Sequence, residues 1–261
     1  MYEFIKNNVK FSDEIALEAQ DRTPLSFNGL HEILDKIKVN FLELSIDSND
    51  IVAIVLPNGP DLGIVFIASS CFSIAAPLNP NYSKNEFKFY LFDLKAKFLI
   101  VDPSLKTEAT IAARELGITI INLFPEKKAG NFILKKDEDN LNCSLFNNNF
   151  DSNTSLLLHT SGTTSKPKLV QLTSDNLINS SLNIGKTLNL KNVKLFDIKN
   201  EDYVNYGSLV INVNFNENDM INSISNYKNI PFYKYYYHLK SLKKFNLYSP
   251  EIAFYYISQI F

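Results

Sequence analysis

The chain has 261 residues, of which 45% are hydrophobic and 21% charged, a composition typical of a globular protein with one large domain or two small ones. Its 26 basic and 28 acidic residues give a net charge of -2, which offers no electrostatic basis for nucleic acid or an anionic membrane as the main partner. The two cysteines, Cys71 and Cys143, form no CxxC or metal-binding pattern and indicate a reducing compartment.

The amino-terminal residues and the longest apolar stretch bear on the compartment. The first residues lack a basic region followed by an apolar run, so no secretory signal is expected. The apolar stretch 64–78 is interrupted by serines and is shorter than the ~20 residues that a membrane span needs. We therefore predict a cytoplasmic protein without a membrane span, with 64–78 as a buried helix and its exit.

Helical and strand-like segments alternate along the first part of the chain. Helices are predicted where apolar residues recur every three or four positions, and strands where a short apolar run is bounded by turn residues. Ser83 and Glu86 have the spacing of a capping box at a helix start, whereas Gly117 is a typical cap at a helix end. Helices are expected at 29–44, at 60–72, after Ser83 and at 107–116, and strands at 51–56, 98–101 and 118–122. The predicted fold class is therefore α/β, a layered sheet with helices on both faces.

The chain then becomes polar. The segment 125–153 has little periodicity, so we expect a surface excursion. A strand-like run at 155–159 opens onto a loop of small polar residues, and a helix is expected from Ser174 to about Leu190. This order of strand, loop and helix favours a functional loop, since binding residues are often carried by loops on a rigid scaffold.

The loop itself offers groups that bind phosphates. Hydroxyl groups surround Gly162, which allows a ligand to approach the backbone, and Pro167 stiffens the chain before Lys168. Hydroxyls, backbone N–H groups and one ammonium group together favour nucleotide phosphates, although a flexible polar linker has the same composition. The P-loop pattern is absent, because Gly162 has no second glycine five residues on. The predicted phosphate-binding residues are Thr160, Ser161, Gly162, Thr163, Thr164 and Lys168.

The three histidines do not form a metal site. His31, His159 and His238 are far apart and lack the spacing of zinc ligands. We expect two of them at the surface and one, His159, beside the loop, where it supports the loop. No metal ligand and no catalytic residue is assigned.

The composition changes after residue 190. Ten of the 13 tyrosines lie there, and 211–215 alternates like a strand, but no known motif is present. Lysines among the aromatic residues are compatible with stacking on single-stranded nucleic acid, yet without a module signature we favour packing or compositional bias. The predicted division is an amino-terminal unit over 1–190 and a tail of unknown fold over 191–261.

The segment from Leu158 to Lys168, LHTSGTTSKPK, closely resembles the phosphate-binding signature of the acyl-adenylate-forming enzymes, the superfamily of acyl-CoA synthetases and luciferases. Three further segments resemble upstream signatures of this family in the same order, so that the resemblance covers about residues 10–190. These segments are 25–30, 56–58 and 76–80.

Within the family the chain is most similar to the oxalate:CoA ligase branch. Ser165 stands where most members have glycine, and 75–79 and 86–91 share this similarity. The resemblance implies a two-step reaction in which ATP and a carboxylate give an acyl-adenylate, and CoA then takes the acyl group. It also implies magnesium with the ATP, and it implies that the six loop residues bind the β- and γ-phosphates.

Two departures from the family affect this expectation. Leu169 follows the lysine where the family usually has glycine, so its side chain is expected to hinder phosphate binding. Beyond residue 190 no counterpart is found of the segments that bind adenine, ribose and magnesium, or of the domain with the catalytic lysine. Because positioning supplies ~7 to 11 kcal/mol of a reaction barrier, we expect little or no ligase activity from this chain alone.

Three functions stay open from the sequence. The first is a truncated homologue of an acyl-CoA synthetase, with a tail that arose by frameshift. The second is a non-catalytic ATP-binding or regulatory module that associates with itself or with a full-length relative through exposed apolar surface. The third is an active oxalate or short-chain acid CoA ligase with an unusual carboxyl terminus.

Overall fold

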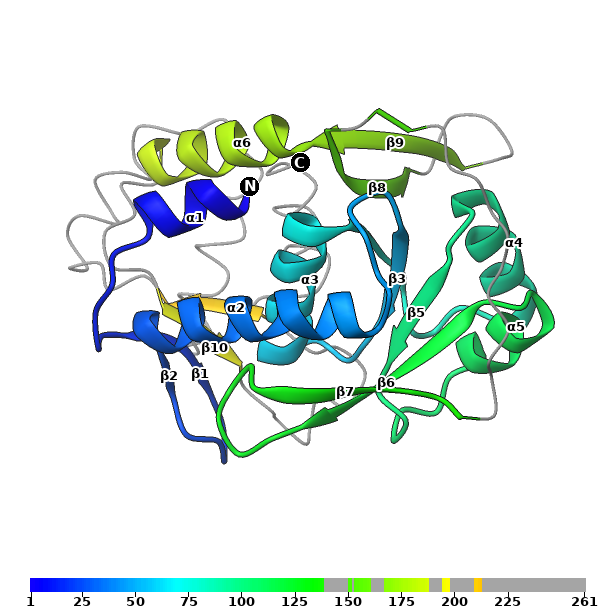
Figure 1. Cartoon of the computed structure of the whole chain (residues 1–261), viewed down its shortest axis with the longest axis horizontal. Helices are drawn as coiled ribbons and strands as arrows, with labels where there is room; N and C mark the ends of the chain where they lie inside the picture. Colours follow the sequence, from blue (N-terminus) through cyan, green and yellow to red (C-terminus); the bar gives the residue numbers. More distant parts are fainter. Residues whose placement is uncertain (139–149, 152, 161–166, 188–193, 198–208, 213–261) are drawn as a thin grey trace, which may run out of the picture.

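The computed structural model describes residues 1–138, 150–151, 153–160, 167–187, 194–197 and 209–212. A central sheet runs through the molecule, and helices lie on both sides of it (Figure 1). The predicted α/β class is therefore confirmed. Most of the tyrosine-rich tail lies outside the described residues.

The main sheet has seven strands, in the order β7 (Phe132–Lys136), β6 (Thr119–Pro125), β5 (Phe98–Val101), β3 (Ile51–Val55), β4 (Ile74–Pro77), β8 (Thr154–Thr160) and β9 (Lys168–Thr173). Neighbouring strands from β6 to β8 run parallel, whereas the edge strands β7 and β9 pair antiparallel with their neighbours. Every residue of β3 and β5 is buried, because helices cover both faces at the centre of the sheet.

One face of this sheet packs against α2 (Phe27–Glu43), α3 (Pro60–Phe72) and α6 (Ser174–Thr187), and the other packs against α4 (Lys84–Leu94) and α5 (Ala109–Glu115). Val52 and Ile54 point to the first face of β3 and belong to the apolar cluster there, which we call the α2/α3 cluster. Ala53 and Val55 point to the opposite face and belong to the α4/α5 cluster. The sheet therefore lies between two separate apolar clusters.

Several helix boundaries agree with the predicted capping residues. The backbone N–H of Ser83 donates to Oε2 of Glu86 at 2.8 Å, and the backbone N–H of Glu86 donates to Oγ of Ser83 at 3.4 Å, which confirms the capping box of α4. Gly117 follows α5 with a φ of 68°, a left-handed conformation that glycine adopts without strain. Helices α3 and α6 begin at the predicted Pro60 and Ser174.

Three strands of the main sheet, β4, β7 and β9, are not part of the sequence-based prediction. Strand β4 occupies the expected helix exit of 64–78, where its small residues lie between β3 and β8 and show no alternation. Strand β7 lies within 125–153, so this segment is not wholly a surface excursion. It pairs antiparallel with β6 at the sheet edge, and its burial alternates because one side faces solvent.

A second, smaller sheet has the strand order β11 (Leu209–Asn212), β10 (Lys194–Asp197), β1 (Ile15–Ala19) and β2 (Leu25–Ser26). Strand β10 pairs parallel with β1, so residues after position 190 join an amino-terminal strand. Strand β11 pairs antiparallel with β10 and overlaps the strand-like segment 211–215. The division of the chain into 1–190 and 191–261 stays a prediction.

His31 is buried, which corrects the expectation that the histidines away from the loop lie at the surface. It is 1% exposed, and its Nε2 lies 3.0 Å from the backbone oxygen of Val9. Its ring stacks on Phe11 with 3.8 Å between centroids, because the chain that follows α1 (Tyr2–Asn8) folds over the start of α2. His238 lies outside the described residues.

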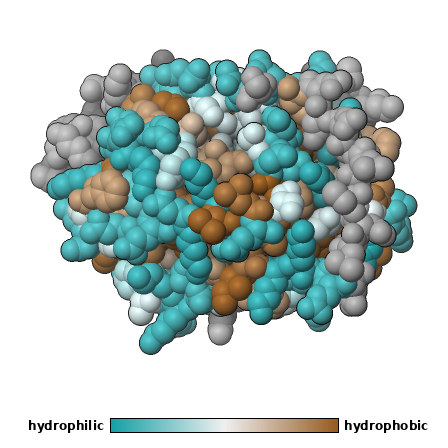
Figure 2. All heavy atoms as spheres, in the orientation of Figure 1, coloured by the Kyte–Doolittle hydropathy of each residue, from teal (hydrophilic) through white to brown (hydrophobic). Residues whose placement is uncertain are grey.

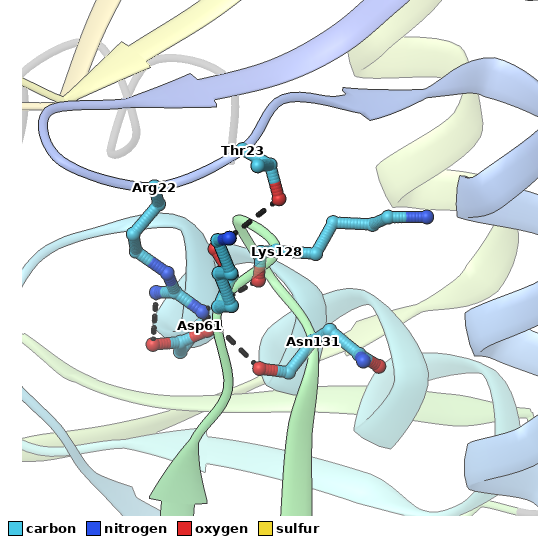
Figure 3. A network of polar contacts seen from close by, with 6 residues as sticks. Arg22, Thr23, Asp61, Lys128 and Asn131 are labelled. Atoms are coloured by element: carbon cyan, nitrogen blue, oxygen red, sulfur yellow. Dashed lines mark hydrogen bonds and ion pairs between the residues drawn. The ribbon is translucent and has the colours of Figure 1, made fainter.

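Arg22 connects three segments that are far apart in the sequence (Figure 3). Its guanidinium forms a bidentate ion pair with Asp61 at the start of α3, with N···O distances of 2.6 and 2.9 Å. It also donates to the backbone oxygens of Lys128 and Asn131, at 2.7 and 3.1 Å, in the turn between β6 and β7. Burial raises the pKa of Asp61 and the guanidinium opposes this shift. Because the pair is bidentate, we treat it as ionised; it fastens the small sheet to the main one.

The surface drawn in Figure 2 is mostly hydrophilic, with a small hydrophobic area near its middle. Exposed apolar side chains on α2 include Val39 and Leu42, with exposed fractions of 53% and 69%. Within the described part of the chain, no helix has both the length and the apolar character that crossing a bilayer requires.

Candidate phosphate-binding site

Two of the six predicted phosphate-binding residues, Thr160 and Lys168, lie at the ends of two paired strands. Strand β8 ends at Thr160 and β9 begins at Lys168, and these two residues are partners in the antiparallel register. The Oγ1 of Thr160 donates to the backbone oxygen of Lys168 at 3.4 Å, and both residues are exposed. The structure therefore brings the first and last of the six residues together. The other four, Ser161, Gly162, Thr163 and Thr164, lie outside the described residues.

Thr160 and Lys168 lie at the carboxyl edge of the parallel strands. Because β8, β4 and β3 are parallel neighbours, the turns after β3 and β4 reach the same edge. Those turns contain most of 56–58 and 76–80, two of the upstream segments that carry the family resemblance. The third segment, 25–30, forms β2 and the first turn of α2 instead. Open α/β sheets bind ligands outside this carboxyl edge, so the grouping suits a ligand site.

Alternation along the β8–β9 hairpin separates its side chains into two sets. Leu158 packs against the α2/α3 cluster, so Thr160, two positions further along β8, lies on that side of the sheet. Lys168 is its partner in register and lies on the same side. His159 points to the opposite side, and its partner Leu169 packs there against the α4/α5 cluster.

The His159 side chain contacts α4, on the side of the sheet opposite to Lys168. Its Nε2 lies 2.9 Å from Oδ2 of Asp93, and because an ionised carboxylate only accepts, the ring nitrogen is the donor. The ring of Tyr90 meets the imidazole edge-on, with 4.7 Å between centroids. The His159 side chain is 6% exposed and that of Asp93 is 44% exposed. His159 lies at the end of β8, and its predicted support of the loop stays a prediction because 161–166 lie outside the described residues.

The partners of His159 were missing from the sequence-based assignment. Asp93 is 66 positions away along the chain, so no local pattern joins the two residues. Tyr90 and Asp93 are three apart on a helix and therefore share a face, but this spacing alone does not point to a histidine on a distant strand. A buried imidazole needs a hydrogen-bond partner, and this requirement is the signal that indicates a partner for His159.

Lys168 has the properties that an anion-binding residue needs. Its side chain is exposed at the start of β9. Among the described residues it forms no ion pair, so its charge is not neutralised by a carboxylate there. The residues present therefore fit a phosphate group, with Lys168 as counter-ion; the Thr160 hydroxyl can donate to a phosphate once it releases the backbone oxygen of Lys168.

Other reactive groups do not add to this site. Within the described ranges, no three His, Cys, Asp or Glu side chains gather closely enough to hold a metal ion. Cys71 is a free thiol, and its burial raises its pKa to about 12, so it stays protonated at neutral pH and is a poor nucleophile. Cys143 lies outside the described residues.

A parallel α/β sheet with a hydroxyl-rich hairpin and a lysine at its carboxyl edge is the arrangement expected of a nucleotide-binding protein. The model of the family described as AMP-binding enzyme matches residues 4–214, and the chain belongs to this family. The family inferred from the LHTSGTTSKPK segment is thereby confirmed.

The curated relatives include CoA ligases. The chain is 37% identical over 183 residues to a protein of Humulus lupulus named "Probable CoA ligase", a match that covers 69% of this chain and 35% of that protein. It is 34% identical over 181 residues to an oxalate–CoA ligase of Arabidopsis thaliana, covering 67% of this chain and 35% of the relative. The chain thus spans about a third of the length of the curated relatives it matches.

Solved structures show the same fold. The apo form of MatB from Rhodopseudomonas palustris superposes with a TM-score of 0.57 at 18% identity, over 73% of this chain and 38% of that one. An o-succinylbenzoate coenzyme A synthetase from Bacillus subtilis, in complex with AMP, gives a TM-score of 0.52 at 23% identity, over 72% of this chain and 46% of that one. At these identities the likeness concerns the fold.

Proposed function

We propose that this chain provides the polyphosphate-binding part of an ATP-dependent acyl-CoA synthetase. In this role Thr160, Ser161, Gly162, Thr163, Thr164 and Lys168 bind the β- and γ-phosphates of ATP. The observation that carries the proposal is the pairing of Thr160 with Lys168 at the carboxyl edge of the sheet, in a member of the AMP-binding family. The hydroxyls and the ammonium group stabilise the negative charge that grows on pyrophosphate as it leaves, which is electrostatic rather than covalent catalysis.

The reaction served is the activation of a carboxylate by ATP, followed by transfer of the acyl group to CoA. The names of the relatives, CoA ligase and oxalate–CoA ligase, support CoA as acceptor and oxalate or another short-chain acid as candidate substrate. Magnesium supplies charge neutralisation to ATP when bound, and no residue is assigned to hold it. The small number of cysteines supports a cytoplasmic location.

We further propose that the 261-residue polypeptide has little ligase activity by itself. It matches about 35% of the length of its ligase relatives, so the remaining parts of those proteins have no counterpart in the match. Orientation of the reactants contributes ~7 to 11 kcal/mol to such reactions, and a phosphate site alone does not position the carboxylate. ATP–pyrophosphate exchange over a panel of acids that includes oxalate tests this: we expect a flat panel, and exchange with any acid means that the chain is an active ligase.

A non-catalytic ATP-binding module is the second candidate. Among the described strands β9 lies at the end of the main sheet, which favours this candidate because an edge strand offers backbone groups to another chain. Association with itself or with a longer relative would then complete the sheet. Sedimentation velocity with and without ATP distinguishes the two candidates, since only the module requires a stable assembly.

Calorimetric titration tests the proposed phosphate site. We expect wild-type protein to bind ATP and inorganic tripolyphosphate, and to bind AMP at least about tenfold more weakly, because AMP lacks the β- and γ-phosphates. Equal affinity for AMP and ATP would place the binding determinants elsewhere. Absence of heat with all three ligands, on protein that circular dichroism shows to be folded, would overturn the proposal.

A further inference from the structure

His159 and Asp93 form a contact between the β8–β9 hairpin and α4. The proposed function does not use this contact. Nε2 of His159 donates to Oδ2 of Asp93 at 2.9 Å. The histidine is enclosed by aromatic rings of the same helix, with Tyr90 at 4.7 Å and Phe89 at 6.5 Å between centroids. The His159 side chain is 6% exposed and that of Asp93 is 44% exposed. Their hydrogen bond therefore lies at the border between the core and the surface.

The helix that receives this contact is itself fixed. Its first turn is closed by the capping box of Ser83 and Glu86. Lys84 and Lys88 on α4 both form ion pairs with Glu115 at the end of α5, the second at 3.0 Å. Phe87, Leu91 and Leu94 are buried in the α4/α5 cluster beneath. A contact to Asp93 therefore ties the hairpin to a rigid support.

The two anchors flank the proposed phosphate ligands in sequence. His159 directly precedes Thr160, and Leu169 directly follows Lys168. His159 and Leu169 are partners in register and both lie on the α4/α5 side of the hairpin, whereas Thr160 and Lys168 lie on the other side. A shift of His159 or Leu169 would therefore move the backbone of a phosphate ligand. Leucine in place of the glycine usual in the family adds an apolar anchor at this position.

We propose that His159 is a positioning residue for ATP phosphate binding: through Asp93, and with Leu169 packed beside it, it fixes the hairpin on α4 so that Thr160 and Lys168 keep their spacing. This inference rests on the proposed phosphate site and adds to it. His159 does not contact the phosphates. Its effect on affinity is exerted through the backbone of the neighbouring residue.

The experiment measures the dissociation constants of ATP and inorganic tripolyphosphate by calorimetry for wild type and six variants. We expect His159→Ala to weaken both ligands about five- to tenfold, less than the full worth of one charge-assisted hydrogen bond, because the contact acts on the phosphates only through the backbone. Asp93→Ala should have the same effect, and the double variant should lose no more than either single one. His159→Gln should restore most of the affinity, because its amide N–H reaches the same carboxylate. A purely structural role would not give this rescue.

Asn85→Ala, an exposed change on α4, is the matched control and should leave both constants unchanged. Wild-type affinity in His159→Ala, while Lys168→Ala binds weakly, would overturn the inference and leave the phosphate site standing. Absence of binding by the wild type would overturn the phosphate site and the inference with it. Where His159→Ala does not fold, Asp93→Ala decides, since an affinity equal to wild type contradicts the proposed link.

Discussion

Thr160 and Lys168 face each other across the β8–β9 hairpin, joined by the hydrogen bond from the threonine hydroxyl to the lysine backbone oxygen. The two ends of the segment that carries the family signature are therefore held by a sheet and not by a flexible linker. A hydroxyl group and a cation are placed together before any ligand arrives, and the hydroxyl proton has only to exchange the lysine backbone oxygen for a phosphate oxygen. Such preorganisation favours anion binding, because little ordering remains to be done on association.

Replacement of Leu169 tests whether this leucine supports or obstructs the hairpin. Leu169 packs against the α4/α5 cluster, so Leu169→Gly should lower the free energy of unfolding by about 1 to 3 kcal/mol through lost apolar burial and added chain freedom. We also expect weaker ATP binding, because the hairpin loses an anchor. Urea unfolding and ATP calorimetry measure the two effects. Tighter ATP binding by Leu169→Gly would show that leucine hinders the phosphate, as its sequence position alone suggests.

Two glycines give opposite predictions for the same substitution. Gly130 has a φ of +73°, and a Cβ there would lie 2.7 Å from Cγ1 of Ile64, so Gly130→Ala should destabilise the fold by about 1 to 3 kcal/mol. Gly63 lies within α3 with no atom within 4 Å of an added Cβ, so Gly63→Ala should stabilise by about 0.5 to 1 kcal/mol. Thermal unfolding compares the pair. A melting temperature that falls in both variants would contradict the described environment of Gly63.

The ion pair of Arg22 with Asp61 should be a large contributor to stability. Asp61→Asn keeps the shape of the side chain but leaves the guanidinium without a counter-ion at a site where both partners are only partly exposed. We expect a loss of about 2 to 4 kcal/mol in the free energy of unfolding. Glu32→Gln, an exposed change on α2, serves as control and should be neutral. An equally small effect in both variants would mean that the pair contributes little net free energy.

Sequence patterns predict the framework of this fold but only part of its sheet. Continuous apolar runs and helical periodicity identify the central elements, and the Ser83–Glu86 box marks a helix start, because these signals are local. Strand β4 escapes prediction because Ile74–Pro77 is short and its burial does not alternate along the strand. Strand β9 escapes it because Lys168 reads as the end of a polar loop.

The site shows the same division between local and distant signals. Its residues carry a signature from which the family follows directly. Asp93 and Tyr90, however, meet His159 only through the packing of α4 on β8, which no neighbouring residue encodes. The burial of His31 likewise depends on a segment that reaches it from outside its own helix.

The half-buried thiol of Cys71 gives a pH prediction. Burial raises its pKa to about 12, above the ~8.5 of a free cysteine, so the native thiol should react slowly with a thiol reagent at pH 8. This burial favours the protonated form, so its stabilising contribution is complete below about pH 8.5 and is lost as the pH rises toward about 12. A Cys143→Ser background leaves one thiol to follow. Equal labelling rates for native and urea-unfolded protein would refute the burial of this side chain.

The most direct test of the phosphate site compares two lysines by ATP calorimetry. Lys168→Ala should weaken ATP binding about tenfold or more, because the counter-ion at the hairpin is removed. Lys136→Ala removes an exposed lysine from β7 at the opposite edge of the sheet and should bind ATP like wild type. The predicted result is a loss of affinity confined to Lys168→Ala. Equal dissociation constants for Lys168→Ala and wild type would contradict the assignment of the β8–β9 hairpin as the phosphate-binding element.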